Sequence, residues 1–270
     1  MPDWLTIARG DAPLIVSMPH TGMEIPLEIE AGLVSPWLAR KDADWHVDKL
    51  YDFAPGLGIT KIRTAISRTV IDVNRDPSGK SLYPGQATTE LCPTTSFDGE
   101  SLYKGNAPSE AEIARRHERY FDPYHAAIAA EIARLKAKHA RVALFDAHSI
   151  RSRIPRLFDG ELPNLNIGTN DGSTCDARLT DAVEQACAAR EFSHVVNGRF
   201  KGGWTTRHYG RPRDGVHAIQ LELACRGYMD EPKEPSLQNW PAPYSDARAA
   251  KMRAVLNRAL QACLQFASDP

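Results

Sequence analysis

Paired cysteines, a long apolar run and an excess of charge are all missing from this sequence, and each absence removes a class of protein. The five cysteines are scattered with no CxxC pair, which argues against a disulfide framework and against a cysteine zinc site. No stretch approaches the roughly 18 uninterrupted apolar residues of a membrane span. The N-terminus lacks the basic start and apolar run of a secretory signal. We therefore expect reduced thiols, a cytoplasmic location and no membrane partner.

The chain also lacks a strong charge imbalance and any linker-like change of composition. Its formal net charge is −1 over 270 residues, which argues against an electrostatic nucleic-acid binder. Apolar and charged fractions are those of an ordinary globular protein. We expect a single domain over residues 1–270 and a small-molecule ligand, while the composition leaves the oligomeric state open.

Short apolar runs alternate with amphipathic stretches along the chain, a pattern typical of α/β layered domains. The runs predict strands at Leu14–Met18, Gly58–Thr64, Val70–Val73, Val142–Phe145, His194–Asn197 and Val216–Leu223. Helical spacing predicts helices at Ser109–Lys138, Asp176–Arg190 and Ser245–Ala267. Ser109 begins a capping box with Glu112, and Pro123 should kink or divide the first helix. The regions 76–108 and 150–174 are long and irregular, which favours a functional role.

Several catalytic signatures are absent. No GxGxxG or GxxxxGK[ST] motif follows a strand, so a phosphate-binding loop is excluded. Ser149 has no GxSxG elbow, and no cysteine stands in a recognisable nucleophile setting. What the chain does have is a set of polar side chains at the ends of predicted strands, where open α/β sheets place their sites.

Histidines and acidic residues form the first part of this set. His20 follows one predicted strand in "IVSMPHTG", and His148 follows another in "ALFDAHSIRSRIP". In "KDADWHVDKLY", Asp44 and Asp48 are four residues apart and would share a helix face, where their mutual repulsion favours a cation. Two histidines and a carboxylate are the common ligand set of a catalytic zinc ion that keeps its fourth position for water.

Arginines and one glutamate form the second part. Arg68 and Arg75 frame the predicted strand of "SRTVIDVNRDP", and the planar guanidinium fork suits carboxylates. Glu222 stands inside the apolar run "GVHAIQLELACRG". Burial there would raise its pKa, and such a glutamate beside a metal-bound water suits a hydrolytic general base.

These motifs resemble, in order, those of the N-formylglutamate amidohydrolase (N-formylglutamate deformylase) family. The resemblance runs from about Leu14 to Glu231 through "PHTG…IP", "DADWHVDKLY", "SRTVIDVNRDP", "FDAHSIRS", "NIGTNDGSTCD" and "FKGGWTTRHYGRP". It implies hydrolysis of N-formyl-L-glutamate to formate and L-glutamate in histidine degradation. It also implies a single catalytic domain with a three-layer α/β/α fold and a mixed central sheet, of the phosphorylase/hydrolase-like type found in zinc-dependent exopeptidases.

The same resemblance suggests roles for individual residues. His20 and His148 are similar to the two metal histidines of the exopeptidases, but the acidic ligand of their HxxE motif is replaced here by Met23. We therefore expect Asp44 as the third ligand of one divalent ion, zinc, and keep open the alternatives Glu24, His46 and Asp48. Glu222 would be the general base, and Arg68 would stabilise the oxyanion. The expected substrate-binding residues are Asn74, Arg75, Arg151, Arg153, Arg207, His208 and Tyr209.

Two other functions remain compatible with these residues. A metal-dependent amidase or carboxypeptidase for another N-acyl amino acid would use the same ligands and Glu222. A non-catalytic protein that binds acidic metabolites would need only the arginines. Metal content and a panel of substrates distinguish the three.

Overall fold

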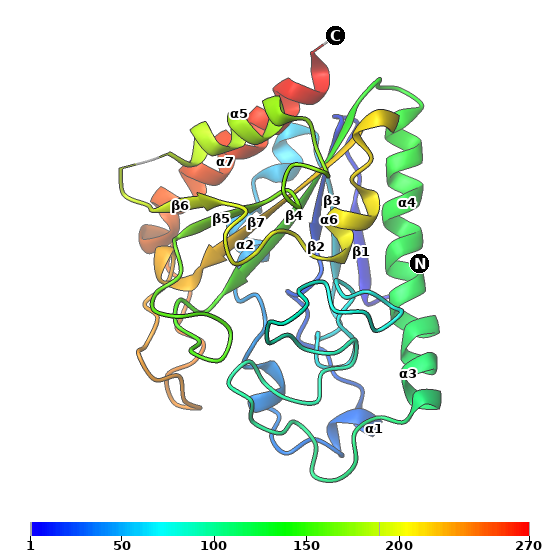
Figure 1. The fold of residues 1–270 in the computed structure, drawn as a ribbon, viewed down its shortest axis with the longest axis vertical. Helices are drawn as coiled ribbons and strands as arrows, with labels where there is room; N and C mark the ends of the chain where they lie inside the picture. Colours follow the sequence, from blue (N-terminus) through cyan, green and yellow to red (C-terminus); the bar gives the residue numbers. More distant parts are fainter. Residues whose placement is uncertain (1, 189, 270) are drawn as a thin grey trace.

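The computed structural model describes residues 2–188 and 190–269, and its centre is a mixed seven-stranded sheet (Figure 1). The strand order is β1-β3-β2-β4-β7-β5-β6. β3, β2, β4 and β7 run parallel to one another, while β1 pairs antiparallel with β3 and β5 pairs antiparallel with β7. The strands are β1 Leu5–Ala8, β2 Leu14–Met18, β3 Thr60–Thr64, β4 Val142–Ile150, β5 Leu165–Gly168, β6 His194–Val196 and β7 Val216–Ala224.

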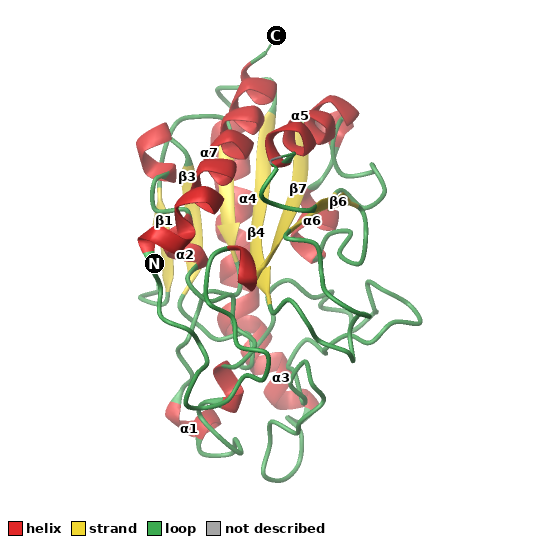
Figure 2. Cartoon of the chain, turned by 90° about the vertical axis from the view of Figure 1, so that its left-hand side faces the viewer, coloured by secondary structure: helices red, strands yellow, loops and turns green. Residues whose placement is uncertain are grey.

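Helices cover both faces of the sheet, as Figure 2 shows with α7 in front of the strands and α4 behind them. The helices are α1 Leu27–Glu30, α2 Val47–Leu50, α3 Glu110–Arg116, α4 Asp122–Lys136, α5 Ala177–Cys187, α6 Trp204–Tyr209 and α7 Asp246–Ser268. Helices α2, α5 and α7 share one apolar cluster with the sheet, and α4 and α6 share another. The three-layer α/β/α arrangement with a mixed sheet is therefore confirmed. Among the described residues, no helix combines the length and the apolar character that crossing a membrane requires.

Side-chain alternation in β4 and β7 explains how one sheet serves both a core and a site. Successive strand residues point to opposite faces, and Ala143, Phe145 and Ala147 of β4 pack in the cluster of α5 and α7. Val142 and Leu144 face α4. The same face continues with polar residues toward the carboxyl end of each strand, namely Asp146 and His148 in β4 and Gln220 and Glu222 in β7. All nine positions of each strand are buried, so these polar groups need partners.

The predicted helix at Ser109–Lys138 is present but divided. A π-helical segment, His117–Phe121, separates α3 from α4 directly before Asp122 and Pro123, which confirms the expected break. The Ser109 hydroxyl accepts from the Glu112 backbone N–H at 3.2 Å. Glu112 itself pairs with Arg115 and Arg116 rather than reaching back, so only half of the capping box forms.

Other predicted elements differ from the structure in ways that packing explains. The strand predicted at Val70–Val73 is wrong: these residues are buried but lie in a turn-rich loop without a ladder. Strands β1 and β5 and helix α6 were missed, and β5 lies inside the predicted irregular region 150–174. Helix α5 ends at Cys187, before the predicted end at Arg190, and Ala189 lies outside the described residues. The long loops gather beyond the carboxyl ends of β2 and β4, below the sheet in Figure 1.

Candidate active site

Three neighbouring parallel strands bring the principal candidate residues together. His20 lies two residues after β2, and His148 and Glu222 lie near the carboxyl ends of β4 and β7. Strand β4 pairs with both β2 and β7, and His148 stands directly beside Glu222 in the ladder. Because the carboxyl ends of parallel strands meet at one edge of the sheet, residues more than 70 positions apart become neighbours.

His20, Asp44 and His148 form a compact buried group. One potential ligand atom from each lies within 4.8 Å of the others. Asp44 Oδ2 is 3.0 Å from His148 Nδ1 and 3.7 Å from His20 Nδ1. The backbone N–H of Asp44 donates to the carbonyl of His20 at 3.0 Å, which fixes the loop that carries Asp44 against the end of β2. This group could hold a metal ion.

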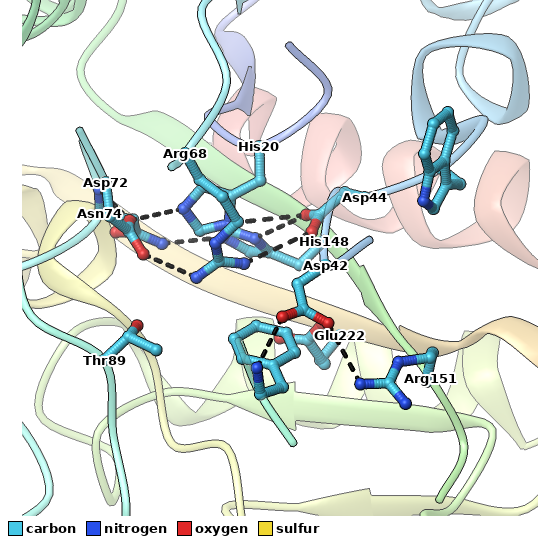
Figure 3. A network of polar contacts seen from close by, with 12 residues as sticks. His20, Asp42, Asp44, Arg68, Asp72, Asn74, Thr89, His148, Arg151 and Glu222 are labelled. Carbon is cyan, nitrogen blue, oxygen red and sulfur yellow. Dashed lines mark hydrogen bonds and ion pairs between the residues drawn. The ribbon is translucent and has the colours of Figure 1, made fainter. Parts of the chain in front are cut away.

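Each histidine also contacts a second carboxylate, other than Asp44, through its Nε2 atom. His20 Nε2 lies 2.6 Å from Asp72 Oδ1, and His148 Nε2 lies 3.0 Å from Asp146 Oδ2. Figure 3 shows both imidazoles between Asp44 on one side and the side chains of Asp72 and Asn74 on the other. A neutral histidine that donates Nε2–H to a carboxylate keeps its Nδ1 lone pair for a metal ion, which is the carboxylate–histidine–metal arrangement of ligand histidines.

The donor set fits a divalent metal ion. Among the described residues, His20 Nδ1 is buried without a hydrogen-bond partner, and it faces Asp44 together with His148 Nδ1. Burial would raise the pKa of Asp44, but His20 and His148 outweigh it and hold that pKa below its usual range. Two imidazole nitrogens and an ionised carboxylate oxygen form the ligand set that zinc accepts. The expectation of Asp44 as third ligand stays a prediction, and it agrees with this placement.

Asp72 connects His20, one of the candidate metal ligands, to two arginines. Its Oδ2 accepts from Arg68 Nη2 at 2.6 Å and lies 3.3 Å from Arg75 Nε. Its Oδ1 also accepts the backbone N–H of Asn74 at 2.9 Å. Although burial opposes ionisation, His20, Arg68 and Arg75 hold the pKa of Asp72 well below its usual range. The loop at 70–75 is thus fixed by charge at the place where a strand was predicted.

Asn74 belongs to the same polar layer. Its Nδ2 donates to Asp146 Oδ2 at 2.9 Å and lies 2.9 Å from His148 Nε2. Its Oδ1 accepts the backbone N–H of Thr205 at 2.7 Å. Both polar atoms of the Asn74 amide therefore have protein partners, so the side chain orients Asp146, which contacts His148, and the start of α6.

Glu222 is buried and lies beside this group. Burial raises the pKa of Glu222 to about 8, against the opposing effects of His148 and Arg68. The Gln220 side chain donates a long hydrogen bond to it, with Nε2 3.5 Å from Glu222 Oε2. A carboxyl group that binds and releases its proton near neutral pH is suited to general acid–base work.

A narrow cavity of about 60 Å³ connects these groups. His20, His148 and Glu222 line it together with three arginines, Arg68, Arg75 and Arg199. Phe97 completes the wall next to Arg68, whose guanidinium carbon lies 4.8 Å from the ring centre. The cavity thus combines two candidate metal ligands and a glutamate suited to proton transfer with a cationic lining that suits an anionic ligand.

The structure places the other predicted arginines outside this cavity. Arg151 is buried in an ion-pair network with Asp42 at 3.1 Å and Asp98 at 2.7 Å, and Figure 3 shows it pointing to Asp42. Arg153 is half exposed and pairs with Glu161 at 2.5 Å. Neither guanidinium lies among the cavity-lining residues.

The predicted contacts from α6 also point elsewhere. Arg207 Nε donates to the carbonyl of Gly202 at 2.9 Å, and His208 is exposed and stacks on Trp204. The Tyr209 hydroxyl donates to the carbonyl of His125 at 2.9 Å. None of the three lines the cavity.

The three alternative metal ligands are exposed or contact other residues. Glu24 is exposed, His46 Nε2 lies 2.9 Å from the carbonyl of Ala242, and Asp48 pairs with Arg63 at 2.7 Å. Sequence reasoning missed Asp72, Phe97 and Arg199. Asp72 stands in the quoted motif "SRTVIDVNRDP" and could have been recognised there, whereas Phe97 and Arg199 lie in loops without a local signal.

The fold and the site together define an α/β protein with a hydrolytic type of centre at the carboxyl edge of its sheet. Residues 12–229 match the N-formylglutamate amidohydrolase family, and the chain belongs to this family. It is 47% identical to an N-formylglutamate deformylase of Pseudomonas aeruginosa, over 100% of this chain and 99% of that protein. It is 45% identical to an N-formylglutamate deformylase of Pseudomonas putida, over 98% and 97% of the two chains.

Solved structures show the same fold at lower sequence identity. The crystal structure of an N-formylglutamate amidohydrolase from Ralstonia eutropha superposes with a TM-score of 0.79 at 24% identity, covering 97% of this chain and 98% of that one. A gene product of Agrobacterium tumefaciens superposes with a TM-score of 0.70 at 17% identity, over 97% and 95%. These likenesses agree with the mixed seven-stranded sheet described above.

Proposed function

We propose that this protein hydrolyses N-formyl-L-glutamate to formate and L-glutamate. The observation that carries the proposal is the cavity in which Glu222 and the His20, Asp44 and His148 group meet three arginines. The substrate has one small acyl group and two carboxylates, and this cavity offers a hydrolytic centre together with cationic walls. Full-length relatives at 45–47% identity are N-formylglutamate deformylases, which agrees with this chemistry.

His20, Asp44 and His148 would hold one divalent metal ion, and zinc is the ion that best suits two imidazoles and one carboxylate. Bound there, the ion would polarise the formyl carbonyl, acidify the attacking water and, as a positive charge, lower the pKa of Glu222. Asp72 and Asp146 hold the two imidazoles in the orientation and protonation state that this role needs.

Glu222 is the proposed general base. It accepts the proton of the water that attacks the formyl carbon, and it returns that proton to the glutamate nitrogen as the C–N bond breaks. This role is supported by its position beside His148 in the ladder and by the fact that both residues line the cavity. Arg68, held by Asp72 at 2.6 Å, presents a fixed positive charge for the developing oxyanion.

Arg75 is the proposed partner of the substrate α-carboxylate. It is tied to Asp72, so it lies close to His20 and to the reacting end of the cavity. Arg75 Nη2 also donates to Thr89 Oγ1 at 3.0 Å, which orients the guanidinium fork. In an N-formyl amino acid the α-carboxylate is separated from the formyl carbon by only the nitrogen and Cα, so it must bind near the centre.

The test is release of glutamate from N-formyl-L-glutamate, with and without a chelator and followed by re-addition of Zn²⁺. We expect turnover that chelation abolishes and zinc restores, and loss of both metal and turnover in His148→Ala. Arg153→Ala, which removes an arginine outside the cavity, is the matched control and should keep full activity. Full activity after verified metal removal would refute the metal-dependent mechanism. Faster turnover of N-acetyl-L-glutamate would point to the broader amidase function instead.

A further inference from the structure

Arg199 lies in the loop after β6 and forms part of the cavity wall. Its guanidinium carbon lies over two aromatic rings, 5.2 Å from the centre of Tyr83 and 5.1 Å from that of Phe200. Two backbone carbonyls orient the fork, because Nε donates to Leu157 at 2.7 Å and Nη2 donates to Ala87 at 2.9 Å. The side chain is therefore held in one position before any ligand binds.

The Arg199 charge has no carboxylate partner among the described residues. Its contacts are neutral carbonyls and ring faces, and its third nitrogen, Nη1, is buried without a hydrogen-bond partner. Burial lowers the pKa of Arg199, and the nearby Arg75 lowers it further. A buried, unpaired guanidinium N–H carries a free-energy penalty that an anionic ligand would remove.

The other two arginines of the cavity differ from it in this respect. Arg68 and Arg75 share the carboxylate of Asp72, at 2.6 Å and 3.3 Å. Each of them therefore has a carboxylate partner within the protein and is tied through Asp72 to His20. Arg199 is fixed instead to the loops that carry Ala87 and Leu157, so its positive charge is not part of the Asp72 ion-pair network.

We propose that Arg199 binds the side-chain carboxylate of the substrate and determines the preference for glutamate among N-formyl amino acids. This inference rests on the proposed function and deepens it. The side-chain carboxylate of glutamate is separated from Cα by two methylene groups, so with the α-carboxylate on Arg75 it must reach a second cation farther from the reacting carbon. Arg199 supplies that cation with a free N–H in place.

The experiment compares N-formyl-L-glutamate with N-formyl-L-glutamine, which has nearly the same shape but no side-chain charge. In the zinc-loaded wild type we expect kcat/KM to favour the glutamate substrate. Arg199→Ala should lower kcat/KM for that substrate about 10- to 100-fold, the worth of a hydrogen bond to a charged group, with little change for the glutamine substrate. Arg199→Met keeps an apolar stem over the two rings and replaces Arg199→Ala if that variant does not fold.

Two further measurements separate recognition from a structural role. Millimolar guanidinium should restore turnover of N-formyl-L-glutamate by Arg199→Ala, and it should leave turnover of N-formyl-L-glutamine unchanged. Arg153→Ala should retain the wild-type ratio of the two substrates. Equal losses on both substrates, or an unchanged ratio in the Arg199 variants, would overturn the inference. A wild-type protein that hydrolyses neither substrate would refute the proposed function itself, whatever the variants do.

Discussion

Replacing Glu222 with glutamine tests the proposed base and its burial in one variant. Because burial raises the pKa of Glu222 from 4.5 to about 8, the folded protein retains a proton that the unfolded chain releases above pH 4.5. The contribution of Glu222 to the free energy of unfolding is therefore fully present below about pH 4.5, and it is lost as the pH rises to about 8. A difference of about 3.5 pKa units corresponds to roughly 5 kcal/mol. Glutamine has almost the same shape and does not ionise, so the Glu222→Gln protein should not lose this stability as the pH rises.

The assay follows thermal unfolding of the metal-free wild type and Glu222→Gln at pH 5 and pH 9, together with turnover of the zinc-loaded proteins. We expect similar melting temperatures at pH 5 and an advantage of roughly 10 °C for the variant at pH 9, since each kcal/mol shifts Tm by about 2–4 °C in a domain of this size. Turnover should fall at least about 100-fold while zinc remains bound. A melting-temperature gap that does not grow with pH would refute the raised pKa, and unimpaired turnover would remove Glu222 as the base.

Three further predictions follow from other contacts. Asp72→Asn removes the charge behind His20 and should weaken zinc binding about 10- to 100-fold, as measured by competition with a chelating dye; unchanged affinity would show that this contact does not orient the ligand. His125 is partly buried, with Nε2 2.8 Å from the carbonyl of Val73, and desolvation lowers its pKa to about 4. The folded protein should therefore lose about 3 kcal/mol as the pH falls from 6.5 to 4, a loss absent in His125→Gln when both are unfolded by urea. Ser109→Ala removes the N-cap of α3 and should cost about 1 kcal/mol in the same assay, and no change would mean that the helix end is satisfied by water.

The central strands could be predicted from the sequence because their residues satisfy a single requirement. β2, β4 and β7 are buried on both faces; β2 and the first residues of β4 form continuous apolar runs, and β7 is predominantly apolar. β1 and β5 have only four residues each, which is too short for a periodic signal. The run Val70–Val73 was misread because its apolar side chains are buried as a strand's would be, although Asp72 and Asn74 turn that segment toward the site.

The candidate site, like the fold, could be predicted from the sequence only in part. His20, His148 and Glu222 could be located because each follows or interrupts an apolar strand. The pairing of His20 with Asp72 spans 52 positions, and no local sequence pattern predicts it. Arginines were the weakest prediction, because a surface arginine, a buried ion-paired one such as Arg151, and a cavity-lining one such as Arg199 have the same side chain. Only the tertiary position of Asp42, Asp98 and Asp72 separates these cases.

The adjacency of β2, β4 and β7 has a consequence for how the protein can change. Neighbouring strands are spaced at about 4.8 Å, so the separation between His148 and Glu222 is set by the backbone ladder. A slip of one residue in β4 would turn His148 away from the cavity and bring Ser149 into its place. The spacing of these groups is therefore nearly invariable, whereas Phe97 and Arg199 lie on loops outside the ladder. We expect new substrate preferences to arise by exchange of loop residues while the distances at the reacting centre stay the same.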